Sequence, residues 1–211
     1  MNKRLLFAGI IFSSLISGCT TIIGGFTSTA KSSGSGVGPS TIAESDVYLH
    51  DDRLNALSVY NGSLTAKKLT IVNSLKVNGD INANKLVARK TTDVTGSLTL
   101  DNSSLYDNCK IGNNITANDS YFAKDIEFGG IQFELTNKTK VIGNIISTSR
   151  YPVTIVVDRS VIKGDIGFAN PKSVVVIQNR GLVKGRILNG TVRDLTGGDS
   201  YQGDDADEEQ Q

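Results

Sequence analysis

Hydrophobic positions recur at an interval of 17 residues through the middle of this 211-residue chain. One apolar column contains Leu64, Ile81, Leu98 and Ile115, and a second contains Tyr60, Val77, Val94, Ile111 and Phe128. Within each row the apolar residues alternate with polar ones, which is the pattern of a strand with one buried face. The sequence therefore predicts short strands whose buried sides repeat from row to row.

A column of small residues precedes the first apolar column by two places. It contains Gly62, Gly79, Gly96, Asn113 and Gly130. Gly and Asn adopt left-handed backbone conformations at little cost. We therefore expect a sharp left-handed corner to recur at this place in every row.

Charged residues repeat at the same interval with alternating sign, as in Lys76, Asp93, Lys110 and Glu127, and again in Lys90, Asp107 and Lys124. Rows stacked about 4.8 Å apart would make these opposite charges neighbours. Each exposed pair contributes at most about 1 kcal/mol, so the columns would set the register more than the stability. Lys68 above Lys85 departs from the alternation.

The interval lengthens to 21 residues in the second half, where Gly143-Asn144-Ile145, Gly164-Asp165-Ile166 and Gly185-Arg186-Ile187 follow one another. The predicted strands 153–158 and 174–179 keep this interval. The segment 129–140 interrupts the pattern, because Gln132 stands where an Ile is due. We expect a bulge there.

Stacked rows without a helical pattern predict an all-β protein, a single-stranded parallel β-helix (solenoid) of about eight coils over residues 53–196, with 17-residue and then 21-residue rows. A β-sandwich of short antiparallel strands is the alternative, but it does not explain the alternating charge columns. Cys109 aligns with Leu75, Thr92 and Ile126, so its thiol is predicted to be a small core group.

The stretches "LKVNGDINANKLVA", "SVIKGDIGFANPKSVVVI" and "LVKGRILNG" resemble the coils of bactofilins, the bacterial polymer-forming cytoskeletal proteins. The resemblance covers roughly residues 54–195. It implies a parallel β-helix that assembles end to end into filaments, usually on the cytoplasmic side. The N-terminus of this chain carries an export pattern instead, so only the architecture transfers.

That N-terminal pattern predicts a signal peptide over residues 1–18. Lys3 and Arg4 precede an apolar stretch, Leu5 to Gly18, which is shorter than the about 20 residues that a membrane-spanning helix needs. Leu15, Ile16, Ser17 and Gly18 come directly before Cys19. An ordinary signal peptide with an incidental Cys is the alternative reading.

The sequence "LISGC" resembles the lipobox of bacterial lipoproteins. The resemblance implies cleavage before Cys19 and attachment of fatty acyl chains such as palmitate to that residue, so the membrane becomes a partner through the N-terminal lipid. Thr20 stands where an Asp would retain the family in the inner membrane. The resemblance therefore implies the outer membrane, facing either the periplasm or the cell surface.

The residues around the solenoid differ in charge. A Ser/Gly/Thr-rich linker, residues 19–52, is predicted to be flexible. The terminal segment 197–211 has six acids and no base, and is predicted to be a disordered acidic tail. The net charge of +1 thus combines a body of about +5 with a tail of −6 and the two positive charges of Lys3 and Arg4. A basic body suits anionic polymers or simply solubility.

Catalytic chemistry has little support, and we expect neither an enzyme nor a bound metal or cofactor. His50, the single histidine, adjoins Asp51 and Asp52 and could bind a cation weakly, although a solvated lead-in segment explains it as well. The best candidate for a catalytic cluster is Asp165 with Lys163, Lys184 and Arg186, and these residues are equally well explained as a solvent-exposed face of neighbouring coils. Without Trp, and with scattered basic residues, nucleic acid is not an expected partner.

Two non-catalytic functions remain. The first is a structural or assembly module that self-associates through the ends of the β-helix, since these ends expose unpaired backbone groups unless they are capped. The N-terminal segment and the exit 191–195 are the possible caps. The second is an envelope or surface binding module, an adhesin or glycan binder, that uses a flat outer face. Tyr106, Tyr121 and Tyr151 fall in different columns and give this reading little support.

Overall fold

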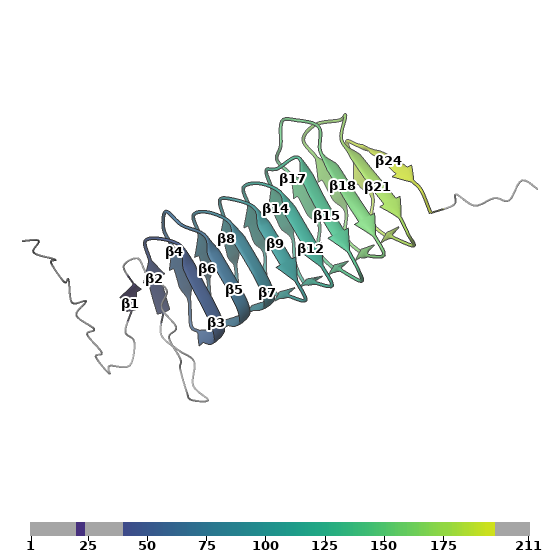
Figure 1. Ribbon diagram of the computed structural model, residues 1–211. Coiled ribbons are helices and arrows are strands. Elements are labelled where there is room, and N and C mark those ends of the chain that lie inside the picture. The colour runs from purple at the N-terminus through teal and green to yellow at the C-terminus, as the bar shows by residue number, and fades with distance from the viewer. Residues whose placement is uncertain (1–19, 24–39, 197–211) are drawn as a thin grey trace, which may run out of the picture.

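The computed structural model describes residues 20–23 and 40–196, which form an elongated stack of parallel strands with no helix in this part of the chain (Figure 1). The stack is a β-solenoid of about nine turns with a spacing near 17 residues. The predicted fold class is confirmed, with about one coil more than the eight expected.

Sheet A forms one side of the solenoid and takes one short strand from each coil. Its order is β1 (Thr20–Ile23), β2 (Ser40–Ala43), β4 (Leu57–Val59), β6 (Leu75–Val77), β8 (Thr92–Val94), β11 (Cys109–Ile111), β14 (Ile126–Phe128), β17 (Ile145–Ser147), β20 (Ile166–Phe168) and β23 (Ile187–Leu188).

Sheet B forms the other two sides and bends between them. In the first coils a single long strand spans both sides: β3 (Val47–Leu54), β5 (Leu64–Ile71) and β7 (Ile81–Ala88). Later coils divide this strand. The second side then contains β9 (Leu98–Asp101), β12 (Ile115–Asn118), β15 (Gln132–Thr136), β18 (Thr154–Asp158), β21 (Val174–Gln178) and β24 (Thr191–Asp194). The third side, called the third face below, contains β10 (Ser104–Leu105), β13 (Tyr121–Phe122), β16 (Lys140–Val141), β19 (Val161–Ile162) and β22 (Leu182–Val183).

The predicted columns are the register of these sheets with one exception: Val59, and not the exposed Tyr60, pairs with Val77, so Tyr60 does not belong to the second apolar column. Leu64 lies opposite Ile81, Ile81 opposite Leu98, and Leu98 opposite Ile115. These inward side chains are buried and belong to one continuous hydrophobic core, which also contains Cys109. Because alternate strand residues face opposite sides, the intervening polar residues point to solvent.

The first charge column is also confirmed as a structural column. Lys76 pairs with Asp93, Asp93 with Lys110, and Lys110 with Glu127 in neighbouring strands of sheet A. Within the described residues, this column contains one ion pair, between Lys110 Nζ and Glu127 Oε1 at 3.3 Å. The column therefore aligns opposite charges without binding each of them tightly.

The explanation expected for the glycine column is wrong. The backbone at Gly62, Gly79 and Gly96 lies outside the left-handed region, and Asn113 has no positive φ. The glycines are required because consecutive coils approach closely here: a Cβ on Gly79 would lie 2.3 Å from the carbonyl oxygen of Gly62. Tight stacking, and not the hand of the turn, explains the glycines of this corner.

Most left-handed residues lie in a different column, at the bend of sheet B, and Asn61 and Asn189 lie outside it. The column contains Asp51, Lys68, Lys85, Asn102, Asp119, Asn137, Lys138, Arg159, Asn179 and Arg180, with φ between 44° and 70°. This left-handed corner explains the like charges of Lys68 and Lys85, because both side chains leave the stack at the bend. Asp51 Oδ1 forms an ion pair with Lys68 Nζ at 2.6 Å.

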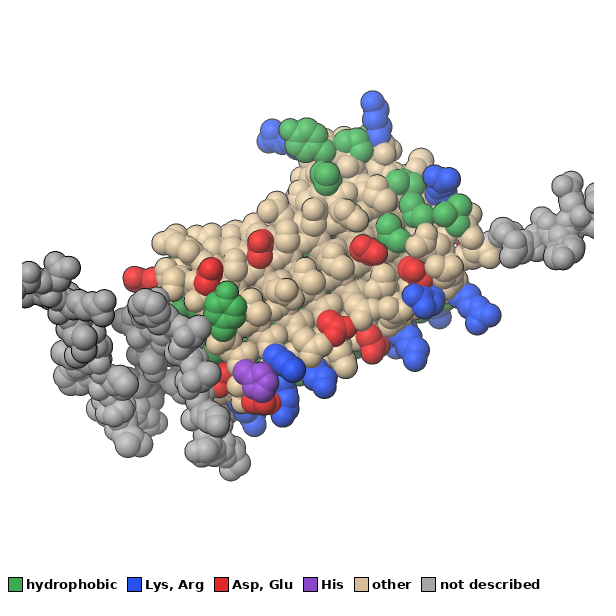
Figure 2. Space-filling view, viewed as in Figure 1, with side chains coloured by type: hydrophobic (Ala, Val, Ile, Leu, Met, Phe, Trp, Pro, Cys, Tyr) green, Lys and Arg blue, Asp and Glu red, His purple; other side chains and the backbone are tan. Residues whose placement is uncertain are grey.

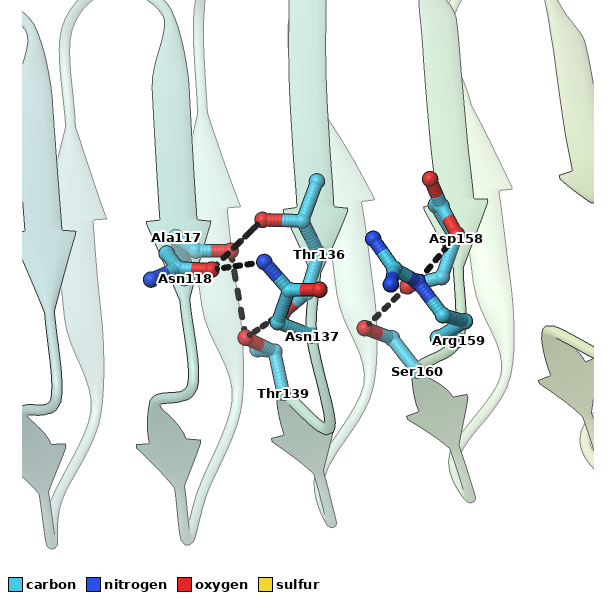
Figure 3. A network of polar contacts seen from close by, with 8 residues as sticks. All are labelled: Ala117, Asn118, Thr136, Asn137, Thr139, Asp158, Arg159 and Ser160. Atoms are coloured by element: carbon cyan, nitrogen blue, oxygen red, sulfur yellow. Dashed lines mark hydrogen bonds and ion pairs between the residues drawn. The ribbon is translucent and has the colours of Figure 1, made fainter. Parts of the chain in front are cut away.

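A ladder of buried hydroxyls lies just after the left-handed corner, and Figure 3 draws two of its members, Thr139 and Ser160. Thr139 Oγ1 accepts the amide of Ser120 at 3.1 Å, and Ser120 Oγ accepts the amide of Ser103 at 3.1 Å. Ser160 Oγ donates to the carbonyl of Asp158 at 2.8 Å. The hydroxyls thus supply hydrogen bonds to backbone groups that the sheet cannot pair at its bend.

The irregular segment is an insertion distributed over one coil. Ile115 lies opposite Phe133, 18 residues later, and Phe122 lies opposite Val141, 19 residues later. Phe133 therefore fills the core position at which Gln132 interrupted the sequence pattern. The later glycines Gly143, Gly164 and Gly185 stack on Lys124 and on one another. They form a separate corner, between the third face and sheet A.

The solenoid begins earlier than residue 53. Strands β2 and β3 belong to the first coil, with Val47 opposite Leu64 and Leu54 opposite Ile71, and β1 pairs in parallel with β2. Residues 40–52 are thus part of the stack and not of a flexible linker. The predicted signal peptide and acidic tail lie outside the described residues.

Candidate functional site

The C-terminal end of the solenoid exposes residues of its inward columns. Val192 lies opposite Val175, yet Val192 is 51% exposed and Val175 0%, since no further coil of the described chain covers β24. The other large apolar side chains exposed near this end, Leu182, Leu188 and Leu195, lie in outward columns, as the pairing of Leu188 with Gly167 shows. Val183 and Ile187 continue the inward columns of Ile162 and Ile166 and are partly buried. We call Val183, Ile187 and Val192 the open end. The exit 191–195, predicted as a possible cap, continues the solenoid instead.

At the N-terminal end the core positions are buried, although β3 pairs with β5 alone among the described strands. Ala43, Val47 and Leu49, which occupy the first coil, are at most 6% exposed. In sheet A, the backbone of β1 pairs with β2, joining Thr20 to Ser40 and Ile23 to Ala43. The two ends therefore differ, and only the C-terminal one presents uncovered core positions among the described residues.

Two polar residues border the open end. Asn189 follows Phe168 in the stack, and its Nδ2 donates to the carbonyl of Phe168 at 2.8 Å. Asp194 occupies the inward column above Ile177, and its carboxylate accepts hydrogen bonds from the amide and hydroxyl of Thr196. These bonds lower the pKa of Asp194. The open end thus combines apolar side chains with a polar border, an arrangement typical of interfaces.

The His50 cluster belongs to strand β3 of the first coil and not to a segment that precedes the solenoid. His50 pairs with Lys67 of the next coil, and its Nδ1 lies 2.9 Å from Asp51 Oδ2. A hydrogen bond from Lys68 lowers the pKa of Asp51. The residues described contain no group of three or more His, Cys, Asp or Glu arranged to hold a metal ion. This cluster is an ion-pair network on the left-handed corner.

Asp52 is buried where the following coils have leucine. It lies opposite Leu69, and burial raises its pKa, although Oδ2 accepts the amide of His50 at 3.1 Å. The folded chain therefore binds a proton at Asp52 more tightly than the unfolded chain does. Folding stability falls as the pH rises from the unfolded pKa, about 3.9, through the higher folded pKa.

We expect Asp52→Asn to raise the free energy of unfolding by about 1 kcal/mol at pH 7, because it removes the cost of a buried charge. The gain should shrink below pH 4, where the wild-type carboxylate is protonated. Urea unfolding at both pH values measures this. Asp51→Asn is the control, since the lowered pKa of Asp51 predicts a loss of stability at pH 7; a loss for Asp52→Asn as well would contradict the assignment.

The second polar cluster is an ion pair between neighbouring coils. Arg186 Nη2 lies 2.7 Å from Asp165 Oδ2, and the Arg186 amide donates to Asp165 Oδ1 at 2.8 Å. The hydrogen bond from Arg186 lowers the pKa of Asp165, and Asp165 raises that of Arg186. Lys163 and Lys184 stay outside this pair and stack on each other at the edge of the third face.

The two cysteines have different positions. Cys109 is buried, as expected, and burial raises the pKa of its thiol to about 12, which leaves little thiolate for reaction at neutral pH. Cys19 and the residues Leu15, Ile16, Ser17 and Gly18 lie outside the described part of the chain, so lipidation stays a prediction.

Two tyrosines meet on the third face. The rings of Tyr106 and Tyr121 lie 5.8 Å apart at 57°, which is a favourable aromatic geometry. In the sequence pattern the two tyrosines fall in different columns. In the structure these two columns are adjacent, and the tyrosines belong to consecutive coils, so their rings meet. A search for contacts between adjacent columns would have found the pair; Tyr151, 72% exposed, lies apart from it.

The described residues include no helix with the length and apolarity to cross a membrane. The stacked strands place the open end, the His50 cluster and the tyrosine pair on three separate parts of one surface. Comparison of this chain with family models, curated proteins and solved structures finds no match.

Proposed function

We propose that this chain is a lipoprotein anchored in the outer membrane through Cys19, and that it serves as a non-catalytic assembly module. Its partner in this proposal is a second copy of the chain, bound at the open end. The observation that carries the proposal is the 51% exposure of Val192 in a column that is buried in the preceding coils.

The asymmetry of the two ends favours a dimer. A solenoid with two open ends can stack head to tail without limit, whereas a patch that pairs with itself closes a twofold dimer. Here the core positions of the first coil are buried and Val192 of the last coil is exposed, so the assembly should stop at two copies. This outcome differs from the filaments that the bactofilin resemblance implies.

Backbone pairing would contribute to such a dimer. Strand β24 pairs with β21 on one side, and β23 pairs with β20, which leaves one edge of each strand without a partner among the described strands. Free strand edges associate with other edges unless charge or a cover prevents it. Asp194 faces this edge, but its carboxylate is held by Thr196, so Val183, Ile187 and Val192 remain available for contact.

The test uses a soluble chain of residues 20–211. We expect light scattering at micromolar concentration to give twice the mass of one chain, and the variant Val192→Asp to be monomeric. Ile131→Asp is the matched control, because Ile131 is equally exposed but lies away from the open end; it should leave the dimer intact. A wild-type chain that stays monomeric at high concentration would reject this function.

The alternative function is an envelope or surface binding module, an adhesin or glycan binder. The Tyr106–Tyr121 pair favours it, because exposed aromatic faces bind sugar rings. A monomeric chain that sediments with peptidoglycan would support this alternative over self-association.

A further inference from the structure

Basic residues gather on the third face in the last three coils, around β16, β19 and β22. We call Lys138, Lys140, Arg159, Lys163, Arg180 and Lys184 the basic strip. Lys138, Arg159 and Arg180 occupy the left-handed corner on consecutive coils, with the Lys138 amide donating to the Arg159 carbonyl at 2.8 Å. Lys163 and Lys184 follow β19 and β22 at the opposite edge. Figure 2 shows Lys and Arg side chains over these C-terminal coils.

Like charges stack on one another here, in contrast to the alternating column of Lys76 and Asp93. Residues 145–196 contain eight Lys or Arg and three Asp or Glu, a net charge of +5, whereas residues 40–144 contain eleven and twelve, a net charge of −1. Arg159 pairs with Asp158 at 3.1 Å. The other five members of the basic strip have no ion-pair partner within the described residues. Charges of one sign about 4.8 Å apart repel unless an anion binds between them.

The chain leaves the described structure beside this strip. The Leu195 amide donates to the Ile177 carbonyl, so Thr196 lies next to the corner that Asn179 and Arg180 form one coil earlier. The next side of the solenoid is the third face, where β22 is the last described strand and pairs with β19 alone. A chain continuing the stack from Thr196 would run along β22.

The sequence that follows has the complementary charge. Residues 197–211 carry Asp199, Asp204, Asp205, Asp207, Glu208 and Glu209 and no basic residue. An extended chain advances about 3.3 Å per residue, so Asp204 reaches about 26 Å from Thr196. The strip covers three coils, roughly 10 Å along the axis. The length of the segment is therefore sufficient for its carboxylates to reach every member of the strip.

We propose that residues 199–209 bind the basic strip of their own chain. The contact is electrostatic, with six carboxylates facing Lys140, Lys163, Arg180, Lys184 and their neighbours, and it weakens as salt screens charges beyond about 10 Å at 0.1 M. This proposal does not depend on self-association. Binding of the acidic segment would nevertheless favour self-association, because it would cancel the positive charge that two C-terminal halves bring together in a dimer.

The first experiment is zero-length carbodiimide coupling, which joins a lysine amine to a carboxylate in direct contact. We use the 20–211 chain at a concentration where it is monomeric. The expected products, identified by mass spectrometry in the monomer fraction, join Lys163 and Lys184 to residues 204–209, and their yield falls at least fivefold in 1 M NaCl. Products confined to a dimer fraction, or spread over lysines of both halves, would overturn the proposal.

A second measurement uses variants. A fluorophore on Ala206→Cys labels the acidic segment, since Cys109 is buried. We expect high anisotropy at low salt and a fall to the value of a free peptide in Lys163→Gln with Lys184→Gln. Lys76→Gln with Lys90→Gln removes the same charge from exposed positions in the other half and should leave the anisotropy unchanged. An equal fall in both double variants would show nonspecific attraction and contradict the assignment.

Discussion

Gly164→Ala is expected to lower the free energy of unfolding by about 3 kcal/mol or more. A Cβ at this position would lie 2.1 Å from the carbonyl oxygen of Gly143 and 2.4 Å from its carbonyl carbon. These are backbone atoms of the preceding coil, so no side-chain rotation relieves the clash. The coils would have to separate, which breaks the hydrogen bonds of the flanking strands.

Gly167→Ala is a matched control from the same coil. No atom lies within 4 Å of the Cβ that this change adds, and replacing Gly with Ala restricts the unfolded chain. We expect its stability to stay within about 0.5 kcal/mol of the wild type or to rise slightly. Urea midpoints at constant m-value measure both variants. Equal midpoints for the two would show that close stacking does not select glycine at this corner.

Cys19→Ser is expected to abolish lipid attachment in a bacterial host. The full-length wild-type chain should incorporate labelled palmitate and fractionate with the outer membrane, and the variant should do neither. The physical reason is that several acyl chains, at about 0.8 kcal/mol per buried methylene, hold a protein on a bilayer almost permanently.

Cys109→Ser is the control for that experiment. The buried position of Cys109 gives an acyltransferase no access, so this variant should still incorporate palmitate. Labelling that survives in Cys19→Ser, or that is lost only in Cys109→Ser, would contradict the proposed anchor. The experiment is separate from the light-scattering test, because the soluble 20–211 chain lacks Cys19.

Much of the fold could be predicted because a solenoid repeats its local environment. Residues such as Leu64 and Ile81 face the same core at the same place in successive coils, so the sequence shows their spacing directly. The first coil was not predicted because Asp52 carries a carboxylate at the position that Leu69 and Leu86 occupy in the next two coils. A periodic pattern detects a coil only where its residues obey the pattern.

Other features depend on distances that no periodicity contains. The position of Gly79 was correct and its explanation wrong, because residue type does not reveal how closely the previous coil approaches. Phe133 was missed as a core residue because two small insertions shift the register by one and then by two positions. Likewise the spacing that identified Val192 as part of the exit segment could not show whether anything covers it.

The pairing of β1 with β2 has a geometric consequence for a membrane-bound form. Thr20 lies beside Ser40 in the first coil. An acyl group on the preceding residue would therefore hold that coil close to the lipid headgroups, with no long linker between the lipid and the solenoid. Two such molecules joined at their far ends would have anchors at opposite extremes of a rod. That rod either lies flat on one bilayer or spans the gap between two facing ones.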